Sequence, residues 1–184
     1  MTPEQLAKSG SEHGTQRALF AWVRWAEVYG FEIANDPASY EGGVAPEMKH
    51  AIMSGQGYDP SLPELAYCHA IPNGGLRDKI TAGKLKHEGV LSGIPDVHLP
   101  LPIVGKFAGL YVEMKRPETL KAGVRKAQII DRAAGSTSNE QDAFIRYARR
   151  VGYAVSVCFD WRSAANDIQS YVELYRSVHG SLVI

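Results

Sequence analysis

Two short apolar runs joined by a turn constrain the fold of this chain most strongly. The first run covers 97–104, the second covers 110–115, and Gly105 between them is a turn-forming residue. Runs of this length that are rich in Val, Ile and Leu are typical of strands. Strands connected by so few residues form a hairpin or lie as antiparallel neighbours. We therefore expect an antiparallel pair at the centre of the fold.

Helical patterns flank this pair of strands. Over 11–29, apolar residues such as Leu19, Trp22 and Val23 recur at helical spacing, and Gly30 offers a stop. Similar patterns predict helices over 77–87, 121–134, 139–150 and 162–176, and apolar runs predict further strands over 65–71 and 153–159. This order predicts an α/β fold, in which a small mixed sheet is flanked by helices.

The length predicts a single domain that covers 1–184. A chain of 184 residues can bury one core but is short for two domains. Its composition, 45% hydrophobic and 22% charged, is typical of soluble globular proteins. The segment 34–64 is rich in Pro and Gly, and we interpret it as a long irregular excursion with one short helix possible over 46–53.

The sequence contains no apolar run that approaches the roughly 20 residues needed to span a bilayer. Its first residues also lack the apolar centre of a secretion signal. We therefore expect a cytoplasmic protein with no membrane partner. Cys68 and Cys158 lie far apart without metal-type spacing, which predicts reduced thiols rather than a disulfide or a zinc site.

Charge is unevenly distributed although the formal net charge is zero. Residues 1–71 carry 4 Lys and Arg against 9 Asp and Glu, 72–135 carry 11 against 6, and 136–184 carry 5 against 5. A basic middle third could hold phosphates, because salt screens distant acids beyond about 8 Å. Uneven solubilising charge explains the same counts equally well.

Candidate catalytic residues lie on the two central strands. Pro95 favours an extended backbone before it, so Asp96 should stand where the first strand begins. Glu113 and Lys115 are two positions apart on the second strand and share one face of the sheet. If the turn is centred at 104–105, Asp96 lies opposite Glu113, with Cβ atoms within about 5 Å.

Two facing carboxylates require a proton, a cation or a register that separates them. Hard oxygen ligands favour Mg²⁺, Mn²⁺ or Ca²⁺ over zinc. Lys115 adds a positive charge suited to a phosphate oxygen or an attacking water. An ordinary solvated face with a Glu–Lys pair would show the same spacing, so the spacing alone does not decide. His98 should share the face of Asp96 and could support the active-site residues without contacting the substrate itself.

Four segments surround these residues in a fixed order: HAIPNGG at 69–75, EGVLSGIPD at 88–96, GLYVEMKRP at 109–117 and NEQDAFIRYARRVGYAVSVC at 139–158. Together they resemble the virus-type replication-repair nuclease (VRR-NUC) domain of the PD-(D/E)xK nuclease superfamily, in its stand-alone phage and bacterial form. The resemblance runs from about Glu12 to Cys158, with insertions at about 34–64 and 118–137. It implies a restriction-endonuclease-like core.

The resemblance also implies roles for individual residues. Asp96 and Glu113 would bind metal together with the backbone carbonyl of Met114, and Lys115 would act in hydrolysis. Glu12 matches a glutamate that family members place on the first helix. An acidic residue in a first helical turn can instead simply complement the helix dipole.

Gln141 matches a glutamine that the family carries on the helix after the E-x-K strand. The local pattern Ser138-x-x-Gln141 also forms a capping box, which could be its whole purpose. The superfamily often has a tyrosine four positions after this glutamine. Ile145 stands there, so no role is carried over to that position.

The resemblance implies that the chain would be a divalent-metal-dependent DNA endonuclease that uses one or two Mg²⁺ or Mn²⁺ ions. It would act as a homodimer on branched DNA such as Holliday junctions, in the cytoplasm of a bacterial host if the chain comes from a phage. The alternatives are a less selective flap or end nuclease, a catalytically silent nucleic-acid-binding module, and an unrelated α/β protein. The last, with a surface Glu–Lys pair, would be favoured if Asp96 and Glu113 were distant in space.

Basic and polar residues supply candidate contacts to the DNA backbone: Asn73, Arg77, Lys84, Lys86, Arg116, Lys121, Arg125 and Arg132. Three of them, Lys121, Arg125 and Arg132, share one side of the helix predicted over 121–134. Contacts of this kind strengthen binding without reading sequence. Plain solvation of the same side chains is the alternative.

Overall fold

A computed structural model describes residues 1–40, 60–72, 84, 87–116, 119–120, 130–132 and 135–182. Its centre is a four-stranded mixed sheet in the order β1-β2-β3-β6. The strands are β1 (His69–Ala70), β2 (Val97–Leu99), β3 (Leu110–Met114) and β6 (Ala154–Cys158). β1, β2 and β3 pair antiparallel, whereas β3 and β6 run parallel. The fold is therefore mixed α/β, as expected.

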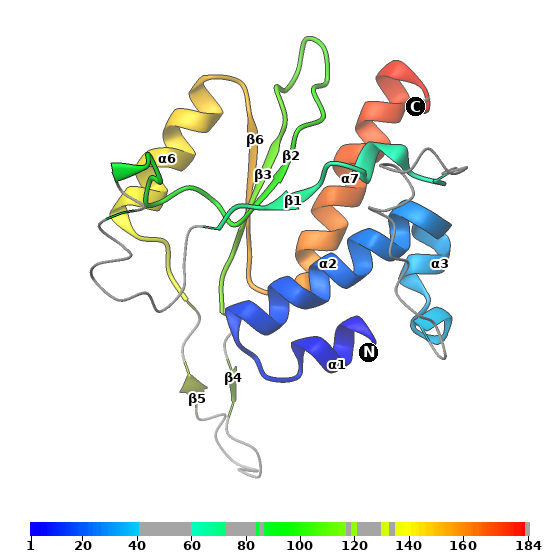
Figure 1. Ribbon diagram of the computed structural model, residues 1–184, viewed down its shortest axis with the longest axis horizontal. Helices are drawn as coiled ribbons and strands as arrows, with labels where there is room; N and C mark the ends of the chain where they lie inside the picture. The colour runs from blue at the N-terminus through cyan, green and yellow to red at the C-terminus, as the bar shows by residue number, and fades with distance from the viewer. Residues whose placement is uncertain are drawn as a thin grey trace.

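Helices cover both faces of the sheet (Figure 1). The apolar face of β3, formed by Leu110, Val112 and Met114, packs in one core with α2 (Glu12–Tyr29) and α7 (Trp161–His179). α6 (Asn139–Arg150) lies on the opposite side. The alternation of side chains along β3 thus sends Tyr111, Glu113 and Lys115 toward the α6 side.

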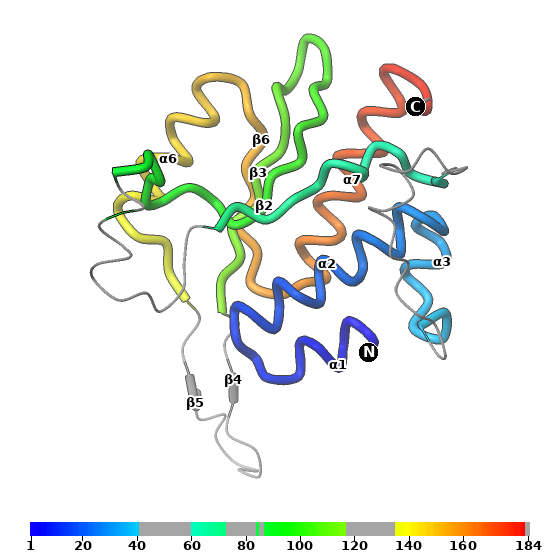
Figure 2. The backbone as a smooth tube through the Cα atoms, in the orientation of Figure 1, coloured from blue at the N-terminus to red at the C-terminus, as the bar shows by residue number. Residues whose placement is uncertain are grey.

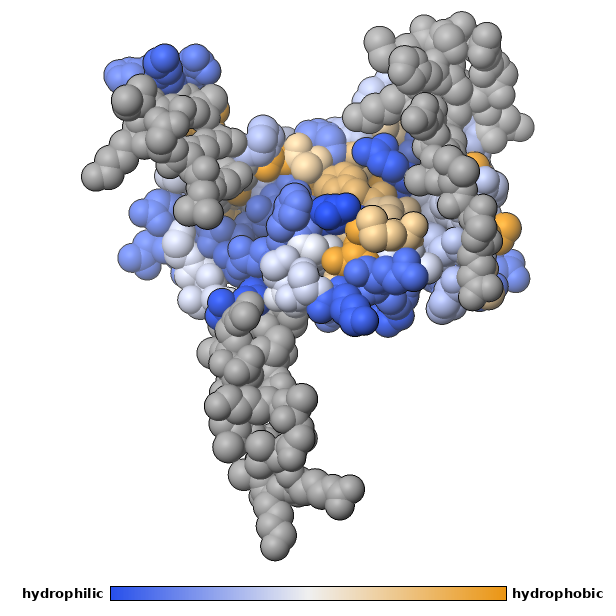
Figure 3. Space-filling model, turned by 60° about the horizontal axis from the view of Figure 1, so that its bottom comes forward, coloured by the Kyte–Doolittle hydropathy of each residue, from blue (hydrophilic) through white to orange (hydrophobic). Residues whose placement is uncertain are grey.

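Shorter elements surround this core. They are α1 (Pro3–Ala7), α3 (Phe31–Asn35), the 3-10 helices η1 (Pro37–Tyr40) and η2 (Pro63–Leu65), and the separate antiparallel pair β4 (Thr119–Leu120) and β5 (Ile130–Arg132). The face that carries α1 turns toward the reader in Figure 3 and is largely hydrophilic around one compact apolar patch. Polar side chains thus cover most of the described surface there.

The helix predicted over 11–29 is α2, and it begins and ends where the sequence predicts. The Ser11 hydroxyl accepts a hydrogen bond from the Gly14 amide at 3.0 Å and caps α2. Gly30, at φ +87°, ends the helix with a hydrogen bond from its own amide to the Ala26 carbonyl. α6 and α7 also confirm the helices predicted over 139–150 and 162–176. Lys84 and His87 have helical backbone, but most of 77–87 and all of 46–53 lie outside the described residues.

The hairpin has the predicted register. Val97 pairs with Val112 and Leu99 with Leu110, as a turn centred at 104–105 requires. The loop between the strands projects beyond the helices (Figure 2). β2 is shorter than the run predicted over 97–104, because Pro100 and Pro102 have no amide hydrogen to donate to a ladder.

Two predicted elements were wrong. The strand predicted over 65–71 is reduced to His69–Ala70, because Pro63 begins the 3-10 helix η2 immediately before it. The helix predicted over 121–134 is contradicted at β5, which is a strand. Gly123 weakens a helix and β-branched Ile130 favours a strand, so propensity opposed the helical spacing. Residues 121–129 lie outside the described part of the chain.

Both cysteines are free thiols, as predicted. Burial raises the pKa of the Cys68 and Cys158 thiols to about 12. Both side chains are therefore protonated and unreactive at neutral pH. None of the helices in the described ranges is long and apolar enough to cross a membrane.

Candidate active site

Asp96 is held by the strands on both of its sides. Its carboxylate oxygen Oδ2 accepts a hydrogen bond from the Met114 amide at 2.8 Å, and its backbone carbonyl accepts one from the Ile71 amide at 2.7 Å. Continuing the β2–β3 register by one position sets Asp96 opposite Glu113. The two carboxyl groups therefore share the face of the sheet that looks toward α6.

Glu113 is almost fully buried, with 1% of its surface exposed. Its carboxylate oxygen Oε1 accepts hydrogen bonds from Lys115 Nζ, at 2.8 Å, and from Gln141 Nε2. Its second oxygen, Oε2, is buried and has no hydrogen-bond partner among the described residues. Burial, with the nearby charges of Asp96 and Glu12, raises the pKa of Glu113 to about 7.

Lys115 and Gln141 complete a closed arrangement around Glu113. Lys115 is 6% exposed, and its Nζ donates to Gln141 Oε1 at 2.8 Å. The Lys115 amide donates to the Cys158 carbonyl at 2.8 Å, which continues the β3–β6 pairing and fixes the base of the side chain. A buried lysine is thereby held against a buried carboxylate.

Gln141 also forms the predicted capping box. Its side-chain Oε1 accepts a hydrogen bond from the backbone amide of Ser138 at 2.9 Å, and the Ser138 hydroxyl accepts one from the backbone amide of Gln141 at 3.2 Å. The predicted capping box is therefore confirmed, and the active-site role of this glutamine stays a prediction. One side chain ties down the start of α6 and contacts both Glu113 and Lys115.

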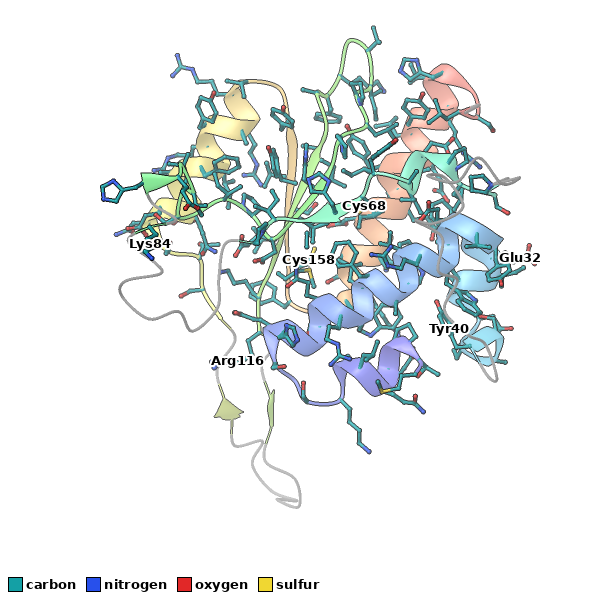
Figure 4. The ribbon with its side chains drawn as sticks, viewed as in Figure 1. Glu32, Tyr40, Cys68, Lys84, Arg116 and Cys158 are labelled. Carbon is teal, nitrogen blue, oxygen red and sulfur yellow. The ribbon has the colours of Figure 1, made fainter. Side chains whose placement is uncertain are left out.

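Glu12 lies at the first residue of α2, at the edge of this cluster. Its Oε1 accepts a hydrogen bond from the Arg116 amide at 3.3 Å. Figure 4 shows Arg116 beside the first turn of α2. The negative charge of Glu12 repels those of Asp96 and Glu113 and so acts to raise the pKa of each.

Gly93 brings the loop before Asp96 into close contact with α6. Its φ is +84°, and a Cβ atom built on it would lie 2.6 Å from the carbonyl carbon of Glu140. Only glycine allows this approach. The contact sets Asp96 and Gln141, from distant parts of the sequence, at the same end of the sheet. Sequence reasoning missed it, because no local pattern reveals which segment Gly93 meets.

The chemistry of these side chains fits a hard divalent cation. Two carboxylates share one face, burial raises the pKa of both, and Glu113 Oε2 is a buried acceptor with no partner in the described ranges. Oxygen donors of this kind suit Mg²⁺ or Mn²⁺. Within the described residues, no three His, Cys, Asp or Glu side chains form a complete metal-binding group. A backbone carbonyl, such as that of Met114, would have to contribute.

The predicted DNA-contacting residues are only partly described. Lys84 is exposed and lies on the α6 side of the molecule (Figure 4). Arg116 is half-buried and directly follows Lys115. Arg132 belongs to β5 instead of a helix. The other predicted contacts lie outside the described residues: Asn73, Arg77, Lys86, Lys121 and Arg125.

His98 shares the face of Asp96, as expected from the spacing. Its ring stacks on Tyr111, with the ring centroids 4.4 Å apart. Its Nε2 is buried and has no hydrogen-bond partner among the described residues. His98 therefore belongs to an aromatic group beside the carboxylates.

Comparisons with known proteins give a likeness to solved structures but not to a family model or a curated protein. No family model matches the chain, and no curated protein matches it. A solved structure described as a VRR_NUC domain protein is 21% identical and covers 70% of this chain and 87% of its own, with a TM-score of 0.43. A likeness at that level carries no functional weight, so the candidate site rests on its own residues.

Proposed function

We propose that this chain is a divalent-metal-dependent DNA endonuclease of the VRR-NUC branch of the PD-(D/E)xK superfamily. The observation that carries the proposal is the environment of Glu113. A buried carboxylate faces Asp96, contacts Lys115 and Gln141, and keeps one oxygen without a partner among the described residues. Burying so many charged groups costs stability, and a catalytic cation site gives a reason to retain them.

Each residue of the cluster has a distinct task in this proposal. Asp96, Glu113 and the Met114 carbonyl would hold one or two cations, with Glu12 contributing from α2. When bound, Mg²⁺ or Mn²⁺ supplies a Lewis acid and lowers the pKa of a coordinated water. Lys115 offsets the negative charge that grows on the phosphate during hydrolysis. Gln141 orients both Lys115 and Glu113 through its two hydrogen bonds.

The proposed substrate is branched DNA, Holliday junctions among them, and the proposed assembly is a homodimer in the cytoplasm. The excess of 11 basic over 6 acidic residues in 72–135 supports a phosphate-rich partner. The motif order from Glu12 to Cys158 supports the family and, through it, the branched substrate. A two-fold dimer would present two identical sites to two strands.

The decisive experiment incubates purified protein with Mg²⁺, Mn²⁺ or EDTA and labelled linear, flap, splayed and four-way DNAs. We expect metal-dependent internal cleavage of the branched substrates. Glu113→Gln keeps the shape of the side chain and should abolish cleavage while DNA binding persists. Binding without cleavage by the parent protein would instead identify a silent binding module.

A further inference from the structure

A band of aromatic rings crosses the sheet from β1 to α6. His69, His98 and Tyr111 occupy paired positions on β1, β2 and β3. The ring centroids of His69 and His98 are 5.3 Å apart, and those of His98 and Tyr111 are 4.4 Å apart with the planes 17° from parallel. Phe144 on α6 meets Tyr111 at 5.2 Å and extends the band to Tyr147.

This aromatic band adjoins the candidate active site on the same face of the sheet. Tyr111 and Glu113 are two positions apart on β3, and His98 and Asp96 are two apart on the neighbouring chain segment. The aromatic pair therefore lies about 7 Å from the carboxylate pair along the strands. In a stacked strand with the rise of B-form DNA, about 3.4 Å per nucleotide, that distance corresponds to about two nucleotide steps.

Both ends of the band are open. His69 is exposed, and Tyr147 is 62% exposed. The His69 ring is held in place because its Nδ1 lies 2.8 Å from the Tyr67 carbonyl oxygen. Packing beneath α6 explains the half-buried rings of His98 and Tyr111. It does not explain aromatic rings presented to solvent at either end.

We infer that the exposed ends of the aromatic band, at His69 and Tyr147, bind unpaired bases of the DNA strand next to the phosphate at the active site. This inference rests on the proposed function for DNA as the partner and refines its substrate class. Bases in a duplex already stack on one another, whereas unpaired bases leave their faces free for aromatic side chains. Among branched DNAs, the preferred substrates are therefore those with a single-stranded segment beside the cleaved bond, such as flap and splayed DNAs, over a fully paired four-way junction.

Metal-free binding tests the band without requiring catalysis. Fluorescence anisotropy would compare a labelled single-stranded oligodeoxynucleotide with an abasic strand of equal length. His69→Ala and Tyr147→Ala should each weaken binding to the base-containing strand by about five-fold or more. Neither variant should change binding to the abasic strand. His69→Phe should restore affinity, since any aromatic ring can stack. Tyr29→Ala, at a 43% exposed ring on α2, is the matched control.

Two results with the variants would overturn the inference. One is unchanged affinity in both alanine variants, and the other is an equal loss on the base-containing and abasic strands, which would mean contact with the backbone alone. Failure of the proposed catalysis would look different, because the parent protein would then distinguish the two strands yet cleave no DNA with Mg²⁺ or Mn²⁺. If the parent protein cleaved DNA but bound the base-containing and abasic strands equally, the proposed nuclease function would stand and the inference about the aromatic band would be contradicted.

Discussion

Gln141 donates a hydrogen bond to the carboxylate of Glu113, and this contact joins the first turn of α6 to the middle of the sheet. The same side chain accepts hydrogen bonds from Lys115 Nζ and the Ser138 amide. Capping and positioning are therefore combined in one residue. Their separate contributions can be measured with two variants.

Gln141→Ala should reduce the rate of DNA cleavage by about 10- to 100-fold, the usual effect of removing a residue that orients a metal ligand. Ser138→Ala removes the N-cap hydroxyl but leaves the contacts of Gln141 with Glu113 and Lys115. It should lower the free energy of unfolding by about 1 kcal/mol and leave cleavage nearly intact. Equal loss of activity in both variants would show that Gln141 acts only through the helix start.

The pKa of Glu113 predicts how pH affects the stability of the metal-free protein. Burial raises this pKa to about 7, above the ordinary value of 4.5 for a glutamate. The folded state therefore binds the proton more tightly, so this contribution to stability is full below pH 4.5 and is lost as pH rises to about 7. The Glu113→Gln side chain cannot ionise, so this variant should not show that decrease in stability with rising pH.

Urea unfolding of the parent protein and of Glu113→Gln across this pH range in EDTA would give the difference between their free energies of unfolding. Subtracting the two curves removes the titration of other groups, such as His98, whose pKa is lowered by burial and by His69. A difference that is flat between pH 4.5 and pH 7 would contradict the raised pKa of Glu113.

Local sequence patterns predicted the parts of the fold that depend on neighbours in the chain. The register of β2 and β3 followed from the turn position, and α2, α6 and α7 followed from helical spacing and caps. The face shared by Glu113 and Lys115 followed from the period of a strand.

The remaining features depend on contacts that local patterns do not encode. Gly93 reads as an ordinary turn residue, although its role is to admit the backbone of Glu140. The helical spacing over 121–134 competed with the strand preference of Ile130, and pairing with β4 decided the outcome at β5. Long-range pairing overrides weak local propensity in such segments.

An ion pair between the buried Glu64 and the partly exposed Arg176 should contribute to stability far from the site. Arg176 donates to both carboxylate oxygens of Glu64, at 2.7 and 2.9 Å, and the Leu182 amide adds a third hydrogen bond at 3.0 Å. Burial alone would raise the pKa of Glu64, but these hydrogen bonds lower that pKa below its ordinary value. Arg176→Ala removes the ion-pair partner of a buried carboxylate and should cost about 3 kcal/mol, the low end of the range for buried pairs, because Arg176 is partly exposed and the Leu182 amide remains.

The matched control is the exposed pair of Glu4 and Arg162. Arg162→Ala should change the free energy of unfolding by no more than about 1 kcal/mol, because water and salt screen exposed pairs. Chemical denaturation of the two variants compares them directly. Similar costs for both would mean that the Glu64 pair gains nothing from its burial.

Gly93→Ala should damage both stability and catalysis, because it combines two separate costs. A φ of +84° strains any residue with a Cβ atom, and that atom would lie 2.6 Å from the Glu140 carbonyl carbon. Gly105→Ala isolates the first cost, since Gly105 also has positive φ, +73°, but no atom within 4 Å of its Cβ position. The control should lose about 1–2 kcal/mol of stability and keep its cleavage rate.

Gly93→Ala should lose a further 1–3 kcal/mol or so, and its cleavage rate should fall, because α6 must move and take Gln141 away from Glu113. Equal cleavage rates in the two variants would separate the position of α6 from catalysis.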